Sequence, residues 1–416
     1  MINMDILKGA CVFGQSGGPT SVINASFYGA VKAALADPRI TAVYGAAHGI
    51  KGMLDSVLYD ISAEAPEELE LLPNTPSSAL GSCRYKLADP DRDDTDFRRL
   101  LETFRKYDIR YFFYNGGNDS MDTCEKVSRF MVRSGWDCRV IGIPKTIDND
   151  LGGTDHCPGY GSAARYIATS CMEISLDASV YDYGQATIVE IMGRHAGWLT
   201  AAAALATHFG YGPDLIYLPE REFDLDAFLD RVSGLLNDRG SAFIAVSEGI
   251  RDKNGTFISE YASQNGTKDA FGHVQLGGLA FFLAAKVKER TGAKTRGIEL
   301  SLLQRCGAHL ASRTDIDEAI MAGRAAVEAA LNGESGKMVA FSRAQNNGKY
   351  VCLTSLVPLS EAANFEKKVP EEWILPDGAG VTQEMIDYIL PLIQGENGRA
   401  QQSGLPCFAK LAKIRA

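Results

Sequence analysis

RVIGIPKTIDND, residues 139–150, is the stretch of sequence that decides the fold. Its first five residues form an apolar, β-branched run, which is typical of a buried strand in a parallel sheet. A similar run, RYFFY at 110–114, is followed by GGNDS at 116–120. Open α/β sheets bind ligands just beyond the carboxyl ends of their strands, so both loops are expected at one site.

Both loops carry groups that handle phosphate. Residues 116–120 supply glycines and a hydroxyl, and residues 144–150 supply Lys145 and two carboxylates two residues apart, Asp148 and Asp150. A cation, a hydroxyl and a pair of carboxylates are the groups that position and stabilise a migrating phosphoryl group. The two loops together therefore predict an enzyme of phosphoryl transfer.

A third glycine loop, GQSGGPT at 14–20, follows the first apolar strand and opens a helical pattern. Glycines let backbone N–H groups approach an anion, and the start of a helix adds partial positive charge. A phosphate-binding role and a purely geometric turn are equally compatible with this loop alone. It matches neither the GxxxxGK[ST] loop nor the GxGxxG dinucleotide fingerprint.

Strand-like and helix-like segments alternate along the chain, which predicts an α/β fold built from right-handed βαβ units. We expect two Rossmann-like, three-layer domains with mostly parallel sheets and the active site in the cleft between them. Strands are expected at 10–13, 41–46, 110–114 and 139–143 in the first sheet and at 187–192, 215–218 and 242–247 in the second. Helices are expected at 20–36, 96–107, 120–134, 162–176, 196–207, 225–237 and 277–290.

Composition narrows the class of protein. A length of 416 residues suits two domains rather than one. The formal net charge of −10 argues against a nucleic-acid partner or an anionic membrane surface. No secretory signal and no membrane span are expected, because no apolar run reaches about 18 residues. Nine scattered cysteines without C-x-x-C spacing suit reduced thiols, so a cytoplasmic location is expected.

Several motifs stand in a fixed order between residues 10 and 325. They are Gly17-Gly18, GGNDS at 116–120, PKTIDND at 144–150, Met192-Gly193-Arg194, Ser247-Glu248 and Gln304-Arg305. Single motifs of this kind are not specific, whereas the ordered set is. In that order they resemble the phosphofructokinase family, and more narrowly its pyrophosphate-dependent branch.

The resemblance implies reversible, Mg²⁺-dependent transfer of a phosphoryl group from pyrophosphate to the 1-hydroxyl of fructose 6-phosphate. Fructose 6-phosphate and pyrophosphate are then the expected partners and Mg²⁺ the cofactor, in a homodimer or homotetramer. Alternatives are an ATP-dependent phosphofructokinase and the same chemistry on sedoheptulose 7-phosphate. A non-catalytic regulatory subunit is a more remote alternative, because it would be expected to lose Asp148 and Asp150, which are both present.

The assignment to the pyrophosphate branch rests on Asp119 and Lys145. The resemblance implies glycine at both positions in ATP users, because the nucleotide passes over these turns. A carboxylate facing a nucleotide phosphate would cost roughly a few kcal/mol, or about a hundredfold in affinity. The alternative is that Asp119 only caps the following helix and Lys145 is a solvated loop charge.

The resemblance also assigns roles on the phosphoryl-donor side. Asp148 is expected to accept the proton of the sugar 1-hydroxyl, with Thr146 and Lys145 as the other catalytic residues. Donor binding is assigned to Gly17, Gly18, Arg84, Asn118, Asp119 and Ser120. Because the family has aspartate where Asn118 stands, and an amide oxygen is a weaker ligand for a hard cation, Asp119 and Asp150 are the expected metal ligands.

On the sugar side, the resemblance assigns substrate binding to Thr146, Asp148, Asp150, Met192, Gly193, Arg194, Glu248, Arg296 and Arg305. Arg296 and Arg305, nine residues apart, are expected to clamp the 6-phosphate. Gln185 stands where the family has an arginine that reaches a neighbouring subunit's site. GHVQLGG at 272–278 mimics the family motif around the second arginine but lacks the arginine itself, so Gln304-Arg305 is taken as the counterpart.

The domain limits follow from where the motifs fall. Residues 5–158 with 305–352 are expected to form the phosphoryl-donor domain, and 159–304 with 353–394 the sugar-phosphate domain, before a tail at 395–416. The basic, amphipathic stretch 408–415 is expected to dock on its own protein rather than on a membrane. Residues 64–70 are expected to form a solvated helix face.

Overall fold

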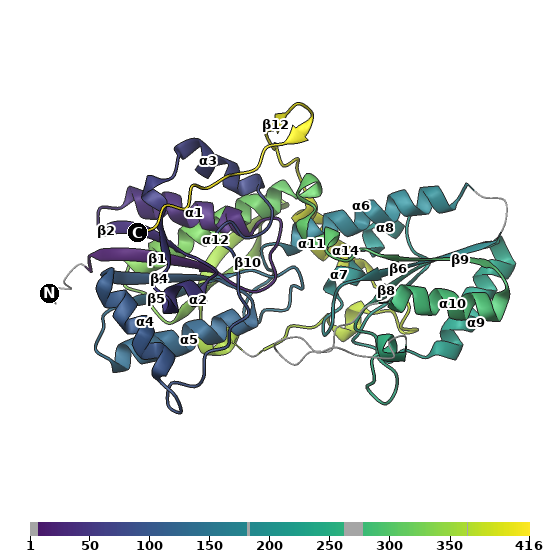
Figure 1. Cartoon of the computed structure of the whole chain (residues 1–416). Coiled ribbons are helices and arrows are strands. Elements are labelled where there is room, and N and C mark those ends of the chain that lie inside the picture. Colours follow the sequence, from purple (N-terminus) through teal and green to yellow (C-terminus); the bar gives the residue numbers. More distant parts are fainter. Residues whose placement is uncertain (1–6, 181–183, 262–277, 364) are drawn as a thin grey trace.

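The first of two large sheets contains seven strands (Figure 1). The computed structural model describes residues 7–180, 184–261, 278–363 and 365–416. The strands of this sheet are β1 (Gly9–Gln15), β2 (Ile40–Ala46), β3 (Leu58–Asp60), β4 (Ile109–Gly116), β5 (Arg139–Pro144), β10 (Lys337–Asn346) and β11 (Lys349–Pro358). Their order is β11-β10-β5-β4-β1-β2-β3. The two outer strands β3 and β11 run antiparallel to their neighbours, and the other pairs are parallel.

The second sheet contains β6 (Gln185–Ile191), β7 (Leu215–Tyr217), β8 (Ser241–Ser247) and β9 (Lys294–Glu299) in the order β7-β8-β6-β9, all parallel. The α/β class with two Rossmann-like, mostly parallel sheets is therefore confirmed. The helices are α1 (Ile23–Ala36), α2 (Ile50–Leu54), α3 (Pro66–Leu71), α4 (Thr95–Lys106), α5 (Asn118–Arg133), α6 (Tyr160–Ala178), α7 (Trp198–Ala201), α8 (Ala204–His208), α9 (Leu225–Arg239), α10 (Leu279–Thr291), α11 (Leu303–Cys306), α12 (Arg313–Leu331), α13 (Leu359–Ala362) and α14 (Gln383–Ile389). Among the described residues, none of the helices has the length and apolar character needed to cross a bilayer.

Helices cover both faces of the first sheet. On one face, α1 and α12 pack over Phe13 and Phe113, whose stacked rings have centroids 4.8 Å apart. On the other face, α4 and α5 cover Phe112 and Val140. The helix α4 presents a buried stripe, Phe97, Leu100, Leu101 and Phe104, at the spacing of one helical face. This three-layer packing fixes the central strands and the loops at their ends.

Helices α1 and α12 approach each other at two glycines. A Cβ on Gly29 would lie 2.1 Å from the carbonyl oxygen of Ile320, and one on Gly323 would lie 1.9 Å from that of Ser26. Any larger residue would push the helices apart. Helix α12 is absent from the sequence-based expectation, so its close contact with α1 is a finding of the structure.

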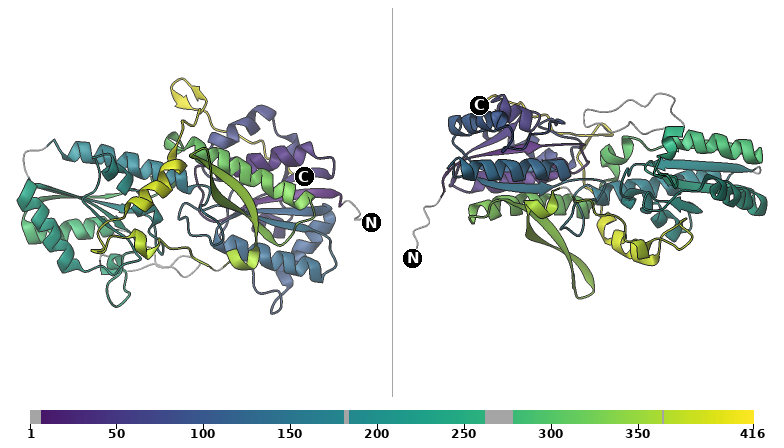
Figure 2. Two further views of the ribbon diagram at one scale, coloured as in Figure 1. Left: turned by 180° about the vertical axis from the view of Figure 1, so that it is seen from behind. Right: turned by 90° about the horizontal axis from the view of Figure 1, so that it is seen from below.

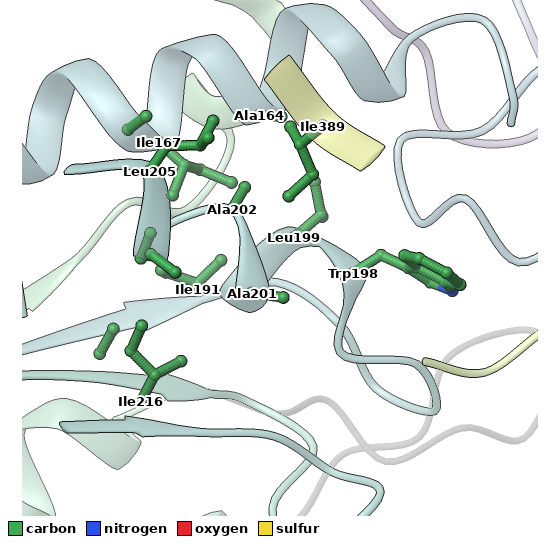
Figure 3. Packing of buried hydrophobic residues seen from close by; sticks show 14 of the residues in the cluster. Ala164, Ile167, Ile191, Trp198, Leu199, Ala201, Ala202, Leu205, Ile216 and Ile389 are labelled. Carbon is green, nitrogen blue, oxygen red and sulfur yellow. The ribbon is translucent and has the colours of Figure 1, made fainter. Parts of the chain in front are cut away.

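The second sheet has its own apolar layers. Figure 3 shows Leu199 and Ala202 of the α7 region between α6, which carries Ile167, and β6, which carries Ile191, while the ring of Trp198 extends to one side. The single helix predicted at 196–207 is wrong in detail, because the chain forms two short helices, α7 and α8. The alanine-rich segment 201–206 is buried.

The predicted domain limits stay a prediction, with one exception. The limit between residues 352 and 353 falls inside β11, which pairs with β10 along its whole length from Lys349 to Pro358. The first sheet therefore reaches further along the chain than predicted, because β10 and β11 form one long hairpin, which extends away from the body of the molecule in Figure 2.

The segment 408–416 docks on the first half of the chain, as predicted, and Figure 1 shows it as the yellow trace that ends beside that half. The carbonyl of Ile414 accepts from the N–H of Asp60, and the N–H of Ala416 donates to Leu58. The side chain of Glu64, only 5% exposed, accepts from the N–H groups of Ala412 and Lys413. The expectation of a solvated face is therefore wrong for Glu64, because the tail covers it.

Deletion of residues 408–416 is expected to lower the free energy of unfolding by roughly 2–4 kcal/mol. Several hydrogen bonds worth about 0.5–1.5 kcal/mol each are lost, and the Glu64 carboxylate loses its donors. Urea unfolding of the full chain and the deletion variant checks this. The Lys413→Ala variant keeps the backbone donors and should unfold close to the full chain, whereas an unchanged midpoint after the deletion would contradict the prediction.

Candidate active site

Three loops meet at the carboxyl edge of the first sheet. Strands β1, β4 and β5 are parallel neighbours, with Gln15 opposite Asn115 and Gly116 opposite Pro144. The loop after β1 carries Gly17 and Gly18, α5 begins at Asn118 after β4, and Lys145 follows β5. The hydroxyl of Ser82 donates to the carbonyl of Gly17 at 2.7 Å and ties the segment of Arg84 to the same edge.

Lys145 is buried against the glycine loop. Its side chain is 4% exposed, and Nζ donates to the carbonyl of Gly18 at 2.7 Å. Gly17 has a φ of 75°, and a Cβ there would lie 3.3 Å from Lys145 Nζ. Burial lowers the pKa of Lys145 to about 8, against the attraction of Asp148 and Asp150. The alternative of a solvated loop charge is therefore wrong for Lys145.

Arg305 lies on the same side as Lys145. A Cβ on Gly18 would be 3.2 Å from Arg305 Nη1. Burial, followed by repulsion from Arg84, lowers the pKa of Arg305, while Asp148 opposes this shift. Lys145 and Arg305 thus lie against the glycine loop, with Arg84 close enough to influence Arg305, and this group of cations suits a polyanionic ligand.

Asp148 and Asp150 lie beside these cations. The hydroxyl of Thr146 is 3.4 Å from Asp148 Oδ2 and accepts from the N–H of Asp148 at 3.0 Å. Burial raises the pKa of Asp148, although Lys145 opposes it. Burial, followed by repulsion from Asp148, raises the pKa of Asp150 to about 7. The two carboxylates are therefore close enough to compete for ionisation, and a bound cation would relieve that competition.

The residues around Asp150 fit a divalent cation. The Asn118 amide donates to Asp150 Oδ2 at 3.3 Å, and its Oδ1 is buried without a hydrogen-bond partner in the described part of the chain. The unpartnered amide oxygen of Asn118 and the carboxylate of the neighbouring Asp150 are oxygen ligands, which Mg²⁺ prefers. Asp119 is exposed in the first turn of α5, so Asp150 and Asn118 fit better than Asp119.

Residues from the second sheet complete the site. Met192, Gly193 and Arg194 follow β6, and Glu248 follows the neighbouring β8. Glu248 Oε1 accepts from the N–H of Gly193 at 3.3 Å. Burial, with a contribution from Asp148, raises the pKa of Glu248 to about 7. The Asp148 carboxylate is therefore near enough to Glu248 to disfavour its ionisation.

Two sugar-side predictions are tested by the register of the second sheet. Arg296 is opposite Thr187 in β6, well before the loop at 192–194, and its Nη1 pairs with Asp177 at 3.0 Å on an exposed surface. The predicted clamp of Arg296 with Arg305 is therefore wrong within one chain, because parallel pairing places Arg296 toward the opposite end of the sheet. Gln185 is buried at the start of β6. The imitation motif at 272–278 lies outside the described residues except for Gly278.

The loop that follows Thr146 is held by side chains far along the chain. Asn149, with a φ of 56°, donates to the hydroxyl of Tyr388 at 2.8 Å. Both ring nitrogens of His156 lie 2.8 Å from carboxylate oxygens, of Asp155 and of Glu318. Burial opposes a charged imidazole, but its hydrogen bonds raise the pKa of His156 well above the usual value. This loop is therefore preorganised around Asp148 and Asp150.

Sequence reasoning missed two residues beside the site. Glu366 forms a β-bridge with Leu151, and its carboxylate contributes to the raised pKa values of Asp148 and Asp150. The N–H of Lys367 donates to the carbonyl of Asp150 at 2.7 Å. Neither belongs to a recognisable motif, so only the tertiary structure could reveal them.

The site combines a glycine loop next to cations, a carboxylate that can act as a general base, and oxygen ligands for a metal ion. This combination is typical of enzymes that transfer phosphoryl groups. Residues 11–330 match the phosphofructokinase family, and the chain belongs to that family. It is 46% identical over 407 residues to the pyrophosphate–fructose 6-phosphate 1-phosphotransferase of Halomonas elongata, covering 97% of this chain and 96% of the relative. It is 45% identical to the protein of the same name from Xanthomonas campestris, covering 98% and 97%.

The fold has a similar solved counterpart. The crystal structure of a pyrophosphate-dependent phosphofructokinase from Marinobacter aquaeolei superposes with a TM-score of 0.88 at 41% identity, covering 98% of this chain and 97% of the other. The likeness therefore extends over both sheets and the tail.

Proposed function

We propose that the protein transfers a phosphoryl group from pyrophosphate to the 1-hydroxyl of fructose 6-phosphate, giving fructose 1,6-bisphosphate and phosphate. One observation carries this proposal: the buried Lys145 ammonium donates to the carbonyl of Gly18 in the glycine loop, from the same loop that carries Asp148 and Asp150. The names of the near-full-length relatives support the same reaction.

In this reaction, Asp148 accepts the proton of the attacking 1-hydroxyl. Lys145, Arg84 and Arg305 bind pyrophosphate and stabilise the charge that develops on the transferring group. Gly17 and Gly18, with Ser120 at the start of α5, offer backbone and hydroxyl donors to the same anion. Thr146 donates its hydroxyl to the group in transfer.

The sugar is held from the second sheet. The loop that binds the sugar consists of Met192, Gly193 and Arg194. The Glu248 carboxylate accepts hydrogen bonds from the sugar hydroxyls. Arg305 lies against Gly18 of the glycine loop and is also the residue that the resemblance assigns to the 6-phosphate, so we propose that it can contact the phosphate of either substrate. This assignment leaves Arg296 without a role in the site of its own chain.

Phosphoryl transfer in this family typically uses a divalent metal, and we propose Mg²⁺. Asp150 and the Oδ1 of Asn118 would hold it, with Asp119 as the less well-placed candidate. When bound, Mg²⁺ neutralises charge between the phosphoryl groups.

Turnover with each donor tests the proposal. Purified protein with Mg²⁺ and fructose 6-phosphate should form the bisphosphate with pyrophosphate and not with ATP. Turnover with ATP alone would contradict the assigned donor and favour the ATP-dependent alternative. A higher kcat/KM with sedoheptulose 7-phosphate than with fructose 6-phosphate would contradict the assigned acceptor, and binding without turnover would favour a regulatory subunit.

Glu248 gives the reaction a specific pH dependence. Its raised pKa of about 7 means that the carboxylate is protonated below and ionised above that pH. Because the ionised form is the better acceptor for sugar hydroxyls, KM for fructose 6-phosphate is expected to fall as pH rises through 7. The Glu248→Gln variant should lose this dependence and keep only the titration of the sugar phosphate. Parallel pH profiles for both proteins would contradict the prediction.

The proposal also covers direction, location and assembly. Pyrophosphate carries no large energy surplus under cell conditions, so the reaction should run both ways. A cytoplasmic location is supported by the nine cysteines, which are all free thiols. Homodimer and homotetramer are the proposed assemblies, and light scattering distinguishes them.

A further inference from the structure

We propose that Lys367 is a positioning residue that holds the loop of Asp148 and Asp150 in place against the sugar-binding loop. Lys367 lies on the segment 365–369, which follows α13 and passes between the two sheets. The inference rests on the proposed function, since it concerns the same reaction. It adds a residue that does not itself touch either substrate.

Lys367 binds the catalytic loop at three points. Its N–H donates to the carbonyl of Asp150 at 2.7 Å. Its ammonium donates to the carbonyls of Asp155 at 2.6 Å and Thr154 at 3.2 Å. These bonds span the turn that begins at Asp150, so the main chain of Asp150 has little freedom to shift.

The same residue contacts the second sheet through Trp198. The indole Nε1–H of Trp198 donates to the carbonyl of Lys367 at 2.9 Å, and the Lys367 ammonium lies 5.1 Å from the centre of the indole ring. Trp198 is buried and begins α7, only a few residues after Arg194 in the sugar-binding loop. One residue thus joins the catalytic loop to the element that follows the sugar-binding loop.

The next residues reinforce this junction. The N–H of Val369 donates to Glu220 Oε1 at 3.0 Å, and the same oxygen accepts from the N–H of Gly197 at 2.8 Å. Gly197 lies between Arg194 and Trp198, so the segment 365–369 is fastened to the sugar side at two successive points.

The buried ammonium of Lys367 interacts with nearby groups of the protein instead of with water. Burial lowers its pKa, against the attraction of Cys157, Asp155 and Asp150, and Arg343 adds to the lowering. Two carbonyl oxygens and an aromatic face replace the water that the ammonium loses. A lysine that served only as a solvent-facing charge would need none of these partners.

The Lys367→Met variant tests the inference. Methionine keeps the length and the apolar contact with Trp198 but cannot donate to the carbonyls of Thr154 and Asp155. Because small displacements of a catalytic group are costly, kcat with pyrophosphate is expected to fall on the order of 10- to 100-fold. KM for fructose 6-phosphate and for pyrophosphate should change by less than about threefold, since no substrate contact is removed.

Three further variants complete the test. Lys367→Arg keeps a cation with several donors and should recover most of the lost kcat. Lys368→Met, at the exposed neighbouring position, should match the parent protein. Trp198→Phe keeps an aromatic ring but removes the indole donor together with part of the buried ring volume, and it should lower kcat by several-fold. Thermal unfolding confirms that each variant is folded at the assay temperature.

The outcomes separate this inference from the proposed function. The inference would be overturned if kcat is unchanged in both Lys367→Met and Trp198→Phe and only the unfolding midpoint is lower. Lys367 would then contribute to stability and not to catalysis. Equal losses in kcat for Lys367→Met and Lys368→Met would also overturn it. Absence of turnover in the parent protein would instead overturn the proposed function.

Discussion

Replacement of Asp148 with asparagine is expected to lower kcat by roughly 10²- to 10⁴-fold, the contribution typical of a general base. The amide keeps the size of the side chain and can still contact Thr146, but it cannot accept the proton of the sugar hydroxyl. Steady-state rates with pyrophosphate, measured in both directions, check this. The loss should appear in both, because one group serves the forward and the reverse step.

Substrate binding should survive the same change. Asp148 contributes to the raised pKa values of Asp150 and Glu248, so removing its charge favours their ionised forms. Calorimetry should therefore show fructose 6-phosphate bound within about threefold of the parent affinity, the margin expected when no bidentate contact is lost. Asp226→Asn, an equal charge change on exposed α9, is the matched control. If the Asp148→Asn variant retains a tenth or more of the parent kcat, Asp148 is not the general base.

Replacement of Lys145 with methionine is expected to lower kcat/KM for pyrophosphate by about 10²- to 10³-fold, or about 2.7–4 kcal/mol, the range found when one preorganised donor is removed. Methionine fills the buried space beside Gly18. The loss in kcat/KM therefore measures the removal of the ammonium group and not the creation of a cavity. Donor-saturation kinetics at fixed fructose 6-phosphate measure the effect. KM for the sugar should stay nearly constant.

Lys51→Met, at an exposed position of α2, provides the control for loss of one lysine. Its kinetics should match those of the parent protein. A Lys145→Met enzyme with unchanged use of pyrophosphate would contradict the role given to this side chain. A loss that falls equally on both substrates would instead indicate general disruption of the loop.

The strands that carry the site could be predicted because they are buried on both faces. Residues 110–114 and 139–143 are continuous apolar runs, and each ends in a loop with phosphate-binding chemistry. The sequence therefore located the catalytic loop and the glycine loops. It could not show that Lys145 is buried, because a lysine in a loop is usually solvated.

Most of the missed parts lack a local signal or depend on pairing. Strand β9 is a polar edge strand and β11 is partly exposed, so neither shows the apolar run of a central strand. Strand β10 does have a buried apolar run at 338–341, which the prediction from sequence overlooked. The position of Arg296 is decided by its partner Thr187 across the sheet, which spacing along the chain does not reveal. Lys367 acts through distant carbonyl groups, and no sequence pattern marks it.

The connection of the first sheet has a consequence for how the protein is made. Strands β1 and β10 belong to one sheet although they begin at residues 9 and 337, and the whole second sheet lies between them in the sequence. During synthesis, the ribosome must therefore produce the second sheet before the first can close. The earlier strands wait with their outer edge unpaired, a state open to wrong pairing with another chain. Chaperone demand should thus be greatest while the middle of the polypeptide is being translated.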